Sequence, residues 1–338
     1  MEAKLALIAM VALAPAMSQP PIVPPAGFDL ARADIEQFVL DVAKRNSLDR
    51  SELDGLLTNA VPQPKIIELI SKPAEKVAPW WQYRERFITE ERIARGVQFW
   101  VDNRESLERI AAARGVPAEY IVAIIGVETF YGRITGRYRV LDALATLAFD
   151  YPPRSDFFRK ELEEFVLLAR ENQLDPLTTT GSYAGAMGAP QFMPSSYRRY
   201  AVDGSEDQRR DLWTSWPDVF ASVANYFREN GWETGAPVIA AARLAPDPDF
   251  QFDPRNLELN ETLQSLNASG VQVDLPAPLS TPALLISAEQ RDGPAYRVGF
   301  KNFHVITRYN RSVRYAMAVN DLAEVIASRM RAAATVAK

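Results

Sequence analysis

Apolar residues recur three and four positions apart along much of the chain, the spacing that places side chains on one face of an α-helix. Residues 28–113 contain two such stripes, and residues 157–171 contain a third. The stripes consist of Ile35, Phe38, Val39 and Val42, of Ile66, Ile67 and Ile70, and of Leu162, Phe165, Val166 and Ala169. Similar spacing predicts helices over residues 216–232 and from residue 303 onward. A mainly helical protein is expected.

The pattern changes between residues 236 and 300. Short apolar runs at positions 271–273, 283–286 and 296–298 are separated by prolines. Runs of this length bounded by prolines are typical of strands. The sequence therefore predicts a small β-rich unit inserted into a helical protein.

Residues 178–197 form an irregular segment whose glycines and prolines are too frequent for a regular helix. The segment is apolar enough to be buried, and a buried loop must satisfy its backbone polar groups with specific partners. Loops of this kind often line functional sites. Ser182 and Gln191 are candidates to bind a polar ligand; a purely structural loop is the alternative.

A carboxylate interrupts the most apolar helix that the pattern predicts, over residues 116–132. Ile121, Ile124 and Ile125 share one face, and the next position on that face is Glu128. A carboxyl group in apolar surroundings tends to keep its proton near neutral pH, as a general acid must. The alternative is a structural ion pair with Arg133, Arg137 or Arg139.

The composition limits which functional groups and partners the protein can use. The 338 residues include 43 acidic and 38 basic ones, for a net charge of −5, and no basic stripe indicates a nucleic-acid partner. Cysteine is absent, which excludes disulfides, thiolate metal sites and a lipid-modified cysteine. The single histidine, His304, is expected to be structural. Carboxylates, tyrosines and amides remain as functional groups.

The first residues resemble an export signal. Residues 1–16 combine Lys4, a short apolar run and an Ala-Pro-Ala cleavage site, which predicts a signal peptide; an uncleaved interfacial anchor is the alternative. The proline-rich residues 17–27 are expected to be a linker.

An acidic segment resembles the beginning of a calcium loop, because Asp203, Ser205 and Asp207 place oxygens at positions one, three and five. Position six is Gln208 where glycine is favoured, and position twelve is Thr214 instead of glutamate. The residues alone favour a solvated acidic turn.

Three separated regions of the chain carry distinctive motifs: GVETFYG at 126–132, GAMGAPQFMPS at 185–195, and ITRYN at 306–310 together with YAMAV at 315–319. In this order they resemble the lytic transglycosylase B family of bacterial cell-wall enzymes. The resemblance implies a lysozyme-like, mainly α core. On this basis we expect a helical part at 28–113, a catalytic core at 114–235, a β-rich insertion at 236–300, and a segment at 301–338 that completes the core and cleft.

The resemblance also implies a reaction: cleavage of the MurNAc–GlcNAc bond of peptidoglycan to give a 1,6-anhydro product. Glu128 would act first as acid and then as base, with help from the N-acetyl group of the substrate and without a metal or redox cofactor. The glycan would be held by residues at matching positions, namely Tyr83, Ser182, Gln191, Tyr226, Tyr309, Asn310 and Tyr315.

Some relatives bind calcium at the position of the acidic loop. The corresponding ligands here would be Asp203, Ser205, Asp207, the Arg209 carbonyl and Asp218. Relatives can also carry a lipid on an N-terminal cysteine, which this chain lacks, so we expect a soluble periplasmic monomer whose partner is the peptidoglycan glycan strand.

Two other functions stay open at this point. A hydrolytic muramidase would need a second carboxylate, for which Asp142 and Asp150 are the nearby candidates. A non-catalytic peptidoglycan-binding protein could use the tyrosines without turnover.

Overall fold

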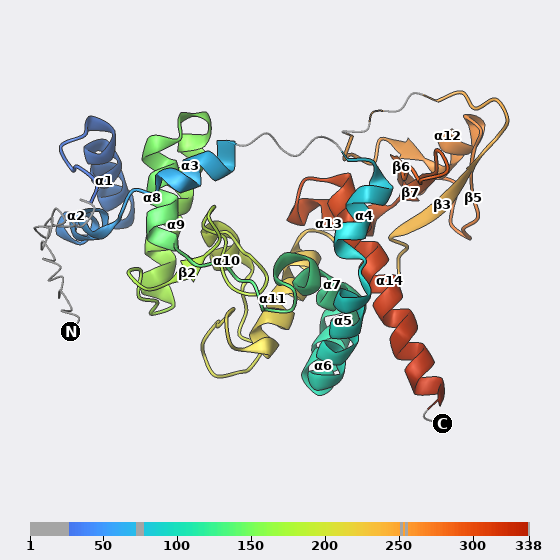
Figure 1. The fold of residues 1–338 in the computed structure, drawn as a ribbon, viewed down its shortest axis with the longest axis horizontal. Coiled ribbons are helices and arrows are strands. Elements are labelled where there is room, and N and C mark those ends of the chain that lie inside the picture. Colours follow the sequence, from blue (N-terminus) through green and yellow to red (C-terminus); the bar gives the residue numbers. More distant parts are fainter. Residues whose placement is uncertain (1–26, 72–77, 251–252, 254–255, 337–338) are drawn as a thin grey trace, which may run out of the picture.

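The computed structural model describes residues 27–71, 78–250, 253 and 256–336. The signal peptide expected at 1–16 and nearly all of the linker expected at 17–27 lie outside these ranges. Helices dominate the described chain, and a small antiparallel sheet lies at one end of it (Figure 1). The prediction of a mainly helical protein with a small β part is confirmed.

One end of the molecule is a helical lobe that combines two separate parts of the chain (Figure 1). Its elements are α1 (Ala33–Asn46), α2 (Arg50–Asn59), α3 (Pro64–Ser71), α8 (Val140–Asp150), η1 (Pro152–Arg154) and α9 (Ser155–Glu171). All residues of α8 except Asp150 are buried, because α3 and α9 pack against it. The apolar stripes expected on α1 and α9 are buried.

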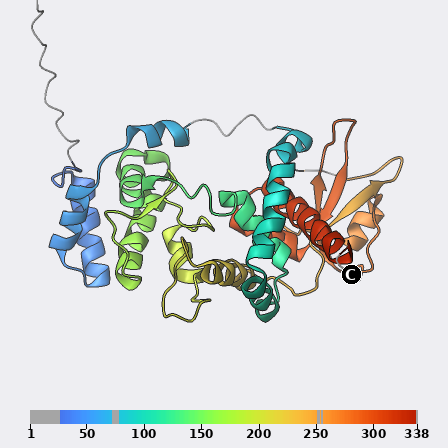
Figure 2. The ribbon, with the colours of Figure 1, turned by 60° about the horizontal axis from the view of Figure 1, so that its bottom comes forward.

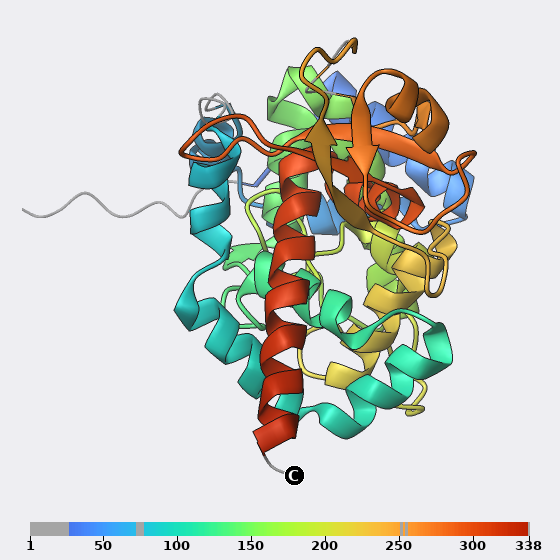
Figure 3. The ribbon, with the colours of Figure 1, turned by 90° about the vertical axis from the view of Figure 1, so that its right-hand side faces the viewer.

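The second group of helices surrounds the last helix of the chain. It comprises α4 (Trp80–Phe87), α5 (Glu90–Asp102), α6 (Arg104–Arg114), α7 (Ala118–Thr129), α13 (Lys301–Tyr309) and α14 (Val313–Val336). Helix α14 packs against α4, α5, α7 and α13, and it runs the length of this group (Figure 3). No single described helix is long and apolar enough to cross a membrane; α6 and α7 pass that test only as a pair, bent by 114°.

The small sheet lies next to the end of α14 that is nearer α4 (Figures 1 and 3), at the opposite end of the molecule from α1 and α2 (Figure 2). Its strands are β3 (Ile239–Leu244), β4 (Glu261–Thr262), β5 (Val271–Val273), β6 (Pro282–Ser287) and β7 (Tyr296–Gly299). They run antiparallel in the order β4-β6-β7-β3-β5. With α12 (Leu263–Ala268) the sheet encloses its own apolar core, which includes Leu263, Val271 and Leu285. The strands fall where the sequence pattern changes.

An irregular segment occupies the middle of the molecule. It follows the short pair of β1 (Tyr138–Arg139) and β2 (Thr180–Gly181), and it leads into α10 (Pro194–Tyr200) and then α11 (Trp216–Glu229). Met187, Ala189 and Phe192 of the segment are at most 2% exposed. Met187 forms bridges to both Gly181 and Phe192, which satisfies backbone groups inside the loop.

Candidate active site

Glu128 lies in the last turn of α7, at the end of an otherwise buried helix. The side chain of Glu128 is half-buried, whereas Ile121, Ile124 and Ile125 are fully buried. Directly after the helix, Phe130, Tyr131 and Gly132 have φ values of 52°, 62° and 78°. These left-handed conformations end the helix abruptly, so Glu128 sits at an exposed end of the core.

The carboxylate of Glu128 is held by Tyr315 in the first turn of α14. The hydroxyl of Tyr315 donates a hydrogen bond to Oε1 of Glu128 at 2.5 Å. Burial raises the pKa of Glu128 to about 7, and the hydrogen bond from Tyr315 opposes that rise. Burial and the nearby carboxylate raise the pKa of Tyr315 well above 10, so Tyr315 stays a donor.

Two further tyrosines lie within the electrostatic reach of Glu128. Burial raises the pKa of Tyr83 on α4, with Arg314 opposing the rise and Glu128 adding to it. Burial also raises the pKa of Tyr309, at the end of α13, and the charge of Glu128 adds to this rise. The structure therefore brings together Glu128, Tyr83, Tyr309 and Tyr315, which come from four different helices.

An aromatic cluster supports Tyr309. The rings of Tyr226 and Tyr309 are 4.7 Å apart, and Phe192 lies 5.7 Å from the first and 5.8 Å from the second. The hydroxyl of Tyr309 donates to the carbonyl of Pro190 at 2.6 Å, and that of Tyr226 donates to the carbonyl of Arg308 at 2.7 Å. Tyr226 thus holds Tyr309 in place.

Gln191 belongs to the same loop and has a constrained side chain. Its Nε2 donates to the carbonyls of Thr135 and Gly188, at 3.1 and 3.0 Å. Gly188 has a φ of 66°, and a Cβ there would lie 2.5 Å from the carbonyl oxygen of Leu212. The loop can therefore take this path only with glycine at 188, which fixes the position of Gln191.

Ser182 and Asn310 are less directly connected to Glu128. The hydroxyl of Ser182 accepts from the backbone N–H groups of Ala184 and Ala186, at 3.3 and 3.0 Å. Asn310 is exposed at the end of α13, beside Tyr309. Within the described residues, neither side chain forms a hydrogen bond to Glu128 or Tyr315.

Sequence reasoning missed two residues that hold the end of α7. The buried hydroxyl of Thr129 lies 2.8 Å from the carbonyl of Ala189, to which it donates, and it accepts from the N–H of Gly132 at 3.0 Å. Arg92 donates from Nε to the carbonyl of Gly126 at 3.2 Å. Thr129 lies within the GVETFYG motif, but no local pattern identifies Arg92 as a partner of α7.

One of the arginines considered as partners of Glu128, Arg139, pairs with another carboxylate. Arg139 donates from Nη2 to Asp142 Oδ1 at 2.5 Å, whereas the hydrogen-bond partner of Glu128 is Tyr315. The lone histidine, His304, contacts the carbonyl of Leu257 through Nδ1 at 2.9 Å.

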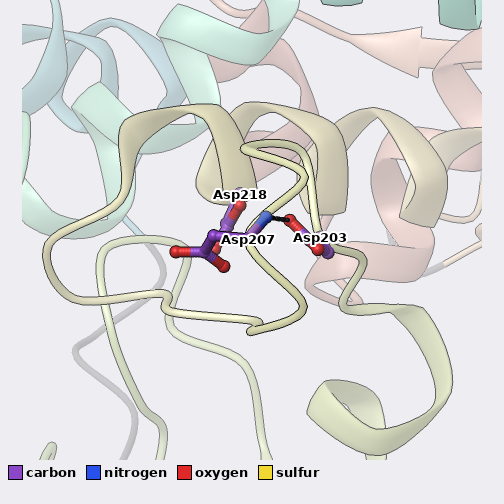
Figure 4. A group of neighbouring side chains, drawn as sticks. All are labelled: Asp203, Asp207 and Asp218. Atoms are coloured by element: carbon purple, nitrogen blue, oxygen red, sulfur yellow. Dashed lines mark hydrogen bonds between the residues drawn. The ribbon is translucent and has the colours of Figure 1, made fainter.

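The acidic segment folds into a loop whose carboxylates converge (Figure 4). One oxygen from each of Asp203, Asp207 and Asp218 lies within 4.8 Å of the others. Asp218 is fully buried and accepts from the N–H groups of Gly204, Ser205 and Asp211. Gln208, at the position where glycine is favoured, takes up the left-handed conformation with a φ of 68°.

The sequence matches a known protein family over most of its length. Residues 31–324 match the family described as the Transglycosylase SLT domain. Membrane-bound lytic murein transglycosylase B of Escherichia coli (strain K12) is 40% identical over 301 residues, which cover 86% of this chain and 82% of the relative.

Solved structures extend the likeness to the fold. Catenated lytic transglycosylase SltB1 from Pseudomonas aeruginosa is 46% identical with a TM-score of 0.84, over 88% of this chain and 98% of that one. Escherichia coli lytic transglycosylase Slt35 in complex with calcium is 39% identical with a TM-score of 0.80, over 90% of this chain and 96% of that one. SltB3 from Pseudomonas aeruginosa in complex with NAG-NAM-pentapeptide is 32% identical with a TM-score of 0.75, over 86% of this chain and 78% of that one. The chain therefore belongs to the lytic transglycosylase family, whose members are enzymes that act on peptidoglycan.

Proposed function

We propose that Glu128 is the single acid and base of the lytic transglycosylase reaction. The observation that carries the proposal is a half-buried carboxyl group with a pKa of about 7, hydrogen-bonded by Tyr315. A group that titrates near neutral pH can hold a proton when the substrate binds and accept one later in the same cycle.

In the first step, protonated Glu128 gives its proton to the oxygen of the glycosidic bond between MurNAc and GlcNAc. The bond from that oxygen to C1 of MurNAc breaks, and GlcNAc leaves with the proton. The carbonyl oxygen of the MurNAc N-acetyl group bonds to C1 and stabilises the positive charge, as in substrate-assisted glycosidases. Glu128 is now a carboxylate, which the hydrogen bond from Tyr315 stabilises.

In the second step, the C6 hydroxyl of MurNAc attacks C1 and displaces the N-acetyl oxygen. The carboxylate of Glu128 removes the hydroxyl proton, which restores the acid and gives a 1,6-anhydro-MurNAc end. Both steps use only Glu128 and groups of the sugar itself. Tyr83, Ser182, Gln191, Tyr226, Tyr309, Asn310 and Tyr315 are proposed to hold the glycan or orient the acid.

The surroundings of the other carboxylates favour this mechanism over hydrolysis by a carboxylate pair, which needs a second group across the bond. Asp142 accepts from the N–H of Val61 at 2.8 Å in addition to Arg139. Asp150 forms an ion pair with Arg32 at 2.7 Å. Both candidates for a second carboxylate are thus engaged in contacts of their own.

Mass spectrometry of products tests the proposal. Purified sacculi would be digested with the wild-type protein, with Glu128→Gln and with Glu119→Gln, which removes a carboxylate from the first turn of the same helix. Muropeptides lighter by one water than reducing-end products are expected from the wild type and Glu119→Gln, and none from Glu128→Gln. Reducing-end products, or full activity of Glu128→Gln, would contradict the mechanism.

We also propose that the acidic loop binds calcium. Asp203, Asp207 and Asp218 bring carboxylate oxygens together, and such an all-oxygen set suits Ca²⁺, whose charge would offset their repulsion. Ser205 and the Arg209 carbonyl would complete the set. The Slt35 relative was solved with calcium. The ion would fix the loop and take no part in the reaction.

We propose that the protein works in the periplasm as a monomer without a lipid anchor. The substrate lies outside the cytoplasmic membrane, and the sequence contains no cysteine to carry a lipid. Cell fractionation and the mass of the secreted protein in solution test these three points; recovery in a detergent-requiring membrane fraction or as a dimer would contradict them.

A further inference from the structure

Arg92, in the first turn of α5, lies where three helices meet. Its Nη1 donates to the carbonyls of Arg86 and Phe87 at the end of α4, at 2.7 and 3.1 Å. Its Nε donates to the carbonyl of Gly126 in α7, at 3.2 Å. Gly126 lies two positions before the proposed acid, so one guanidinium group connects the end of α4 to the last turns of α7.

The same guanidinium contacts two aromatic rings. It lies 5.3 Å from the ring centre of Phe87 and 5.0 Å from that of Phe130, which belongs to the left-handed turn after Glu128. A planar guanidinium can stack on rings and donate hydrogen bonds through its edge at the same time. The ammonium group of a lysine has no such plane, so these contacts together require an arginine.

The backbone of Arg92 holds the same turn. The hydroxyl of Tyr131 donates to the carbonyl of Arg92 at 2.8 Å. A Cβ at Gly96 of α5 would lie 2.5 Å from that hydroxyl, and one at Gly126 of α7 would lie 2.7 Å from it. Tyr131 therefore fits between α5 and α7 because both positions lack a side chain. The turn is fastened to Arg92 through its side chain and through its carbonyl.

The charge of Arg92 is not balanced by an ion pair within the part of the chain that the structure describes. Burial lowers the pKa of Arg92, because it disfavours the charged form. Arg95, one turn later, is 39% exposed and pairs with Glu91 at 2.9 Å. A partly buried cation that binds only carbonyls has a cost in desolvation, which an apolar side chain would avoid. The arginine thus provides the bridge between helices rather than packing alone.

We propose that Arg92 is a positioning residue for the reaction: it fixes the end of α7 so that Glu128 stays within hydrogen-bond distance of Tyr315. Tyr315 comes from α14, which packs against both α4 and α7. Because the bridge joins α4 to α7, it also fixes Glu128 relative to Tyr83 on α4. The inference rests on the proposed function and deepens it, since it names a residue outside the site that sets the geometry of the acid.

The first test uses Arg92→Met, which removes the bridge, and Arg92→Lys, which keeps the charge but not the planar group. For each variant, kcat and KM are measured on purified glycan strands, at a temperature where urea unfolding shows that the protein is folded. The matched control is Arg95→Met. Arg95 lies 5.5 Å from the ring centre of Phe130, but it donates to Glu91 and not to α7.

In Arg92→Met, kcat is expected to fall about 10- to 100-fold with little change in KM, because a misplaced acid affects the reaction more than binding. Arg92→Lys should lose nearly as much, and Arg95→Met should keep the wild-type kcat. A wild-type kcat in Arg92→Lys, or equal losses in Arg92→Met and Arg95→Met, would overturn the inference.

A second test follows the position of the carboxyl without turnover. Carbon-13 NMR of protein labelled in its glutamate carboxyls gives the titration of Glu128, whose signal is identified by its absence in Glu128→Gln. In the wild-type background, Tyr315→Phe should raise the titration midpoint by about one pH unit. In the Arg92→Lys background the same substitution should raise it clearly less, because the hydrogen bond is already weakened.

The two tests separate this inference from the proposed function. Equal shifts of the midpoint in both backgrounds would overturn the role of Arg92, whether or not Glu128 is the catalytic acid. Full activity of Glu128→Gln would instead contradict the proposed function.

Discussion

The hydroxyl of Tyr315 lies 2.5 Å from Oε1 of Glu128, although the two residues are 187 positions apart in the sequence. Burial raises the pKa of this carboxyl, and the hydrogen bond from Tyr315 opposes that rise. The pair therefore sets how readily the proposed acid gives up its proton.

Removing that donor should weaken the acid. In Tyr315→Phe the pKa of Glu128 is expected to rise by about one unit, since a hydrogen bond to a charged group contributes about 1.5 kcal/mol. The alkaline limb of the pH dependence of kcat/KM should move to higher pH by a similar amount. Tyr120→Phe is the matched control, because it removes a buried hydroxyl that donates instead to Asn320. If the alkaline limb of kcat/KM stayed in place in Tyr315→Phe, Tyr315 would not be the residue that lowers the pKa of Glu128.

The raised pKa of Glu128 also affects stability. The pKa is about 7 in the folded protein against 4.5 ordinarily, so between these values the folded state binds a proton that the unfolded state has lost. Wild-type stability should therefore fall as pH rises through this range. Relative to wild type, Glu128→Gln should gain about 2 kcal/mol between pH 4.5 and pH 8, allowing for partial exposure.

Urea unfolding at the two pH values measures this difference. Glu105→Gln, which replaces an exposed carboxylate of α6, serves as the control and should show no such gain. If Glu128→Gln lost stability relative to wild type as pH rose, the carboxyl would not be destabilised by its burial.

A buried aspartate ties the sheet to α4 and α14. Asp321 is 4% exposed, and its carboxylate binds Arg297 at 2.5 Å and Arg84 at 2.8 Å. Asp321→Asn would leave two guanidinium groups without a compensating charge, and a loss of about 2 kcal/mol is expected because both arginines are partly exposed. Denaturant unfolding would show the loss. The exposed ion pair of Arg243 and Asp274 on the sheet provides the comparison, and Asp274→Asn should change the free energy of unfolding little. If Asp321→Asn and Asp274→Asn had equal effects, the ion pairs of Asp321 would not contribute more to stability than an exposed pair.

Calcium should stabilise the protein through the acidic loop. Adding Ca²⁺ after chelation is expected to raise Tm, because an ion that binds only the folded state stabilises it by mass action. Asp207→Asn should abolish the shift while leaving the fold intact, since Asp207 is exposed. Asp274→Asn, remote in sequence from the loop, should retain the full response. An unchanged Tm in the wild type would contradict the calcium proposal.

Helical periodicity drew attention to Glu128, the proposed acid, but left an ion pair open as the alternative and did not identify its partner. Glu128 stands out because it occupies a core position after Ile121, Ile124 and Ile125. The residues near it in sequence suggested an arginine partner, whereas the structure supplies Tyr315 from a distant helix. The family resemblance named Tyr315, but the hydrogen bond itself depends on how α7 and α14 pack, which no local pattern encodes.

The contacts that position the site were missed for the same reason. Thr129 resembles an ordinary helix residue, and only the fold brings its hydroxyl to the carbonyl of Ala189, 60 positions away. The shift to strands after residue 236 was visible, since strands have their own periodicity. The bond of Asp321 to two arginines was not, because charge pairing across elements leaves no periodic signal.

The turn after Glu128 has a consequence for how this sequence can change. Phe130 and Tyr131 take up left-handed conformations that glycine adopts at no cost, and such strain amounts to about 1 kcal/mol per residue. Glycine at either position would relax the backbone but release the aromatic packing that holds the helix end. The chain has Phe130 and Tyr131 there instead, and it accepts this loss of folding free energy while their packed rings keep the backbone next to Glu128 rigid. Substitutions selected for thermal stability alone would be expected to remove this strain first, and the rigidity with it.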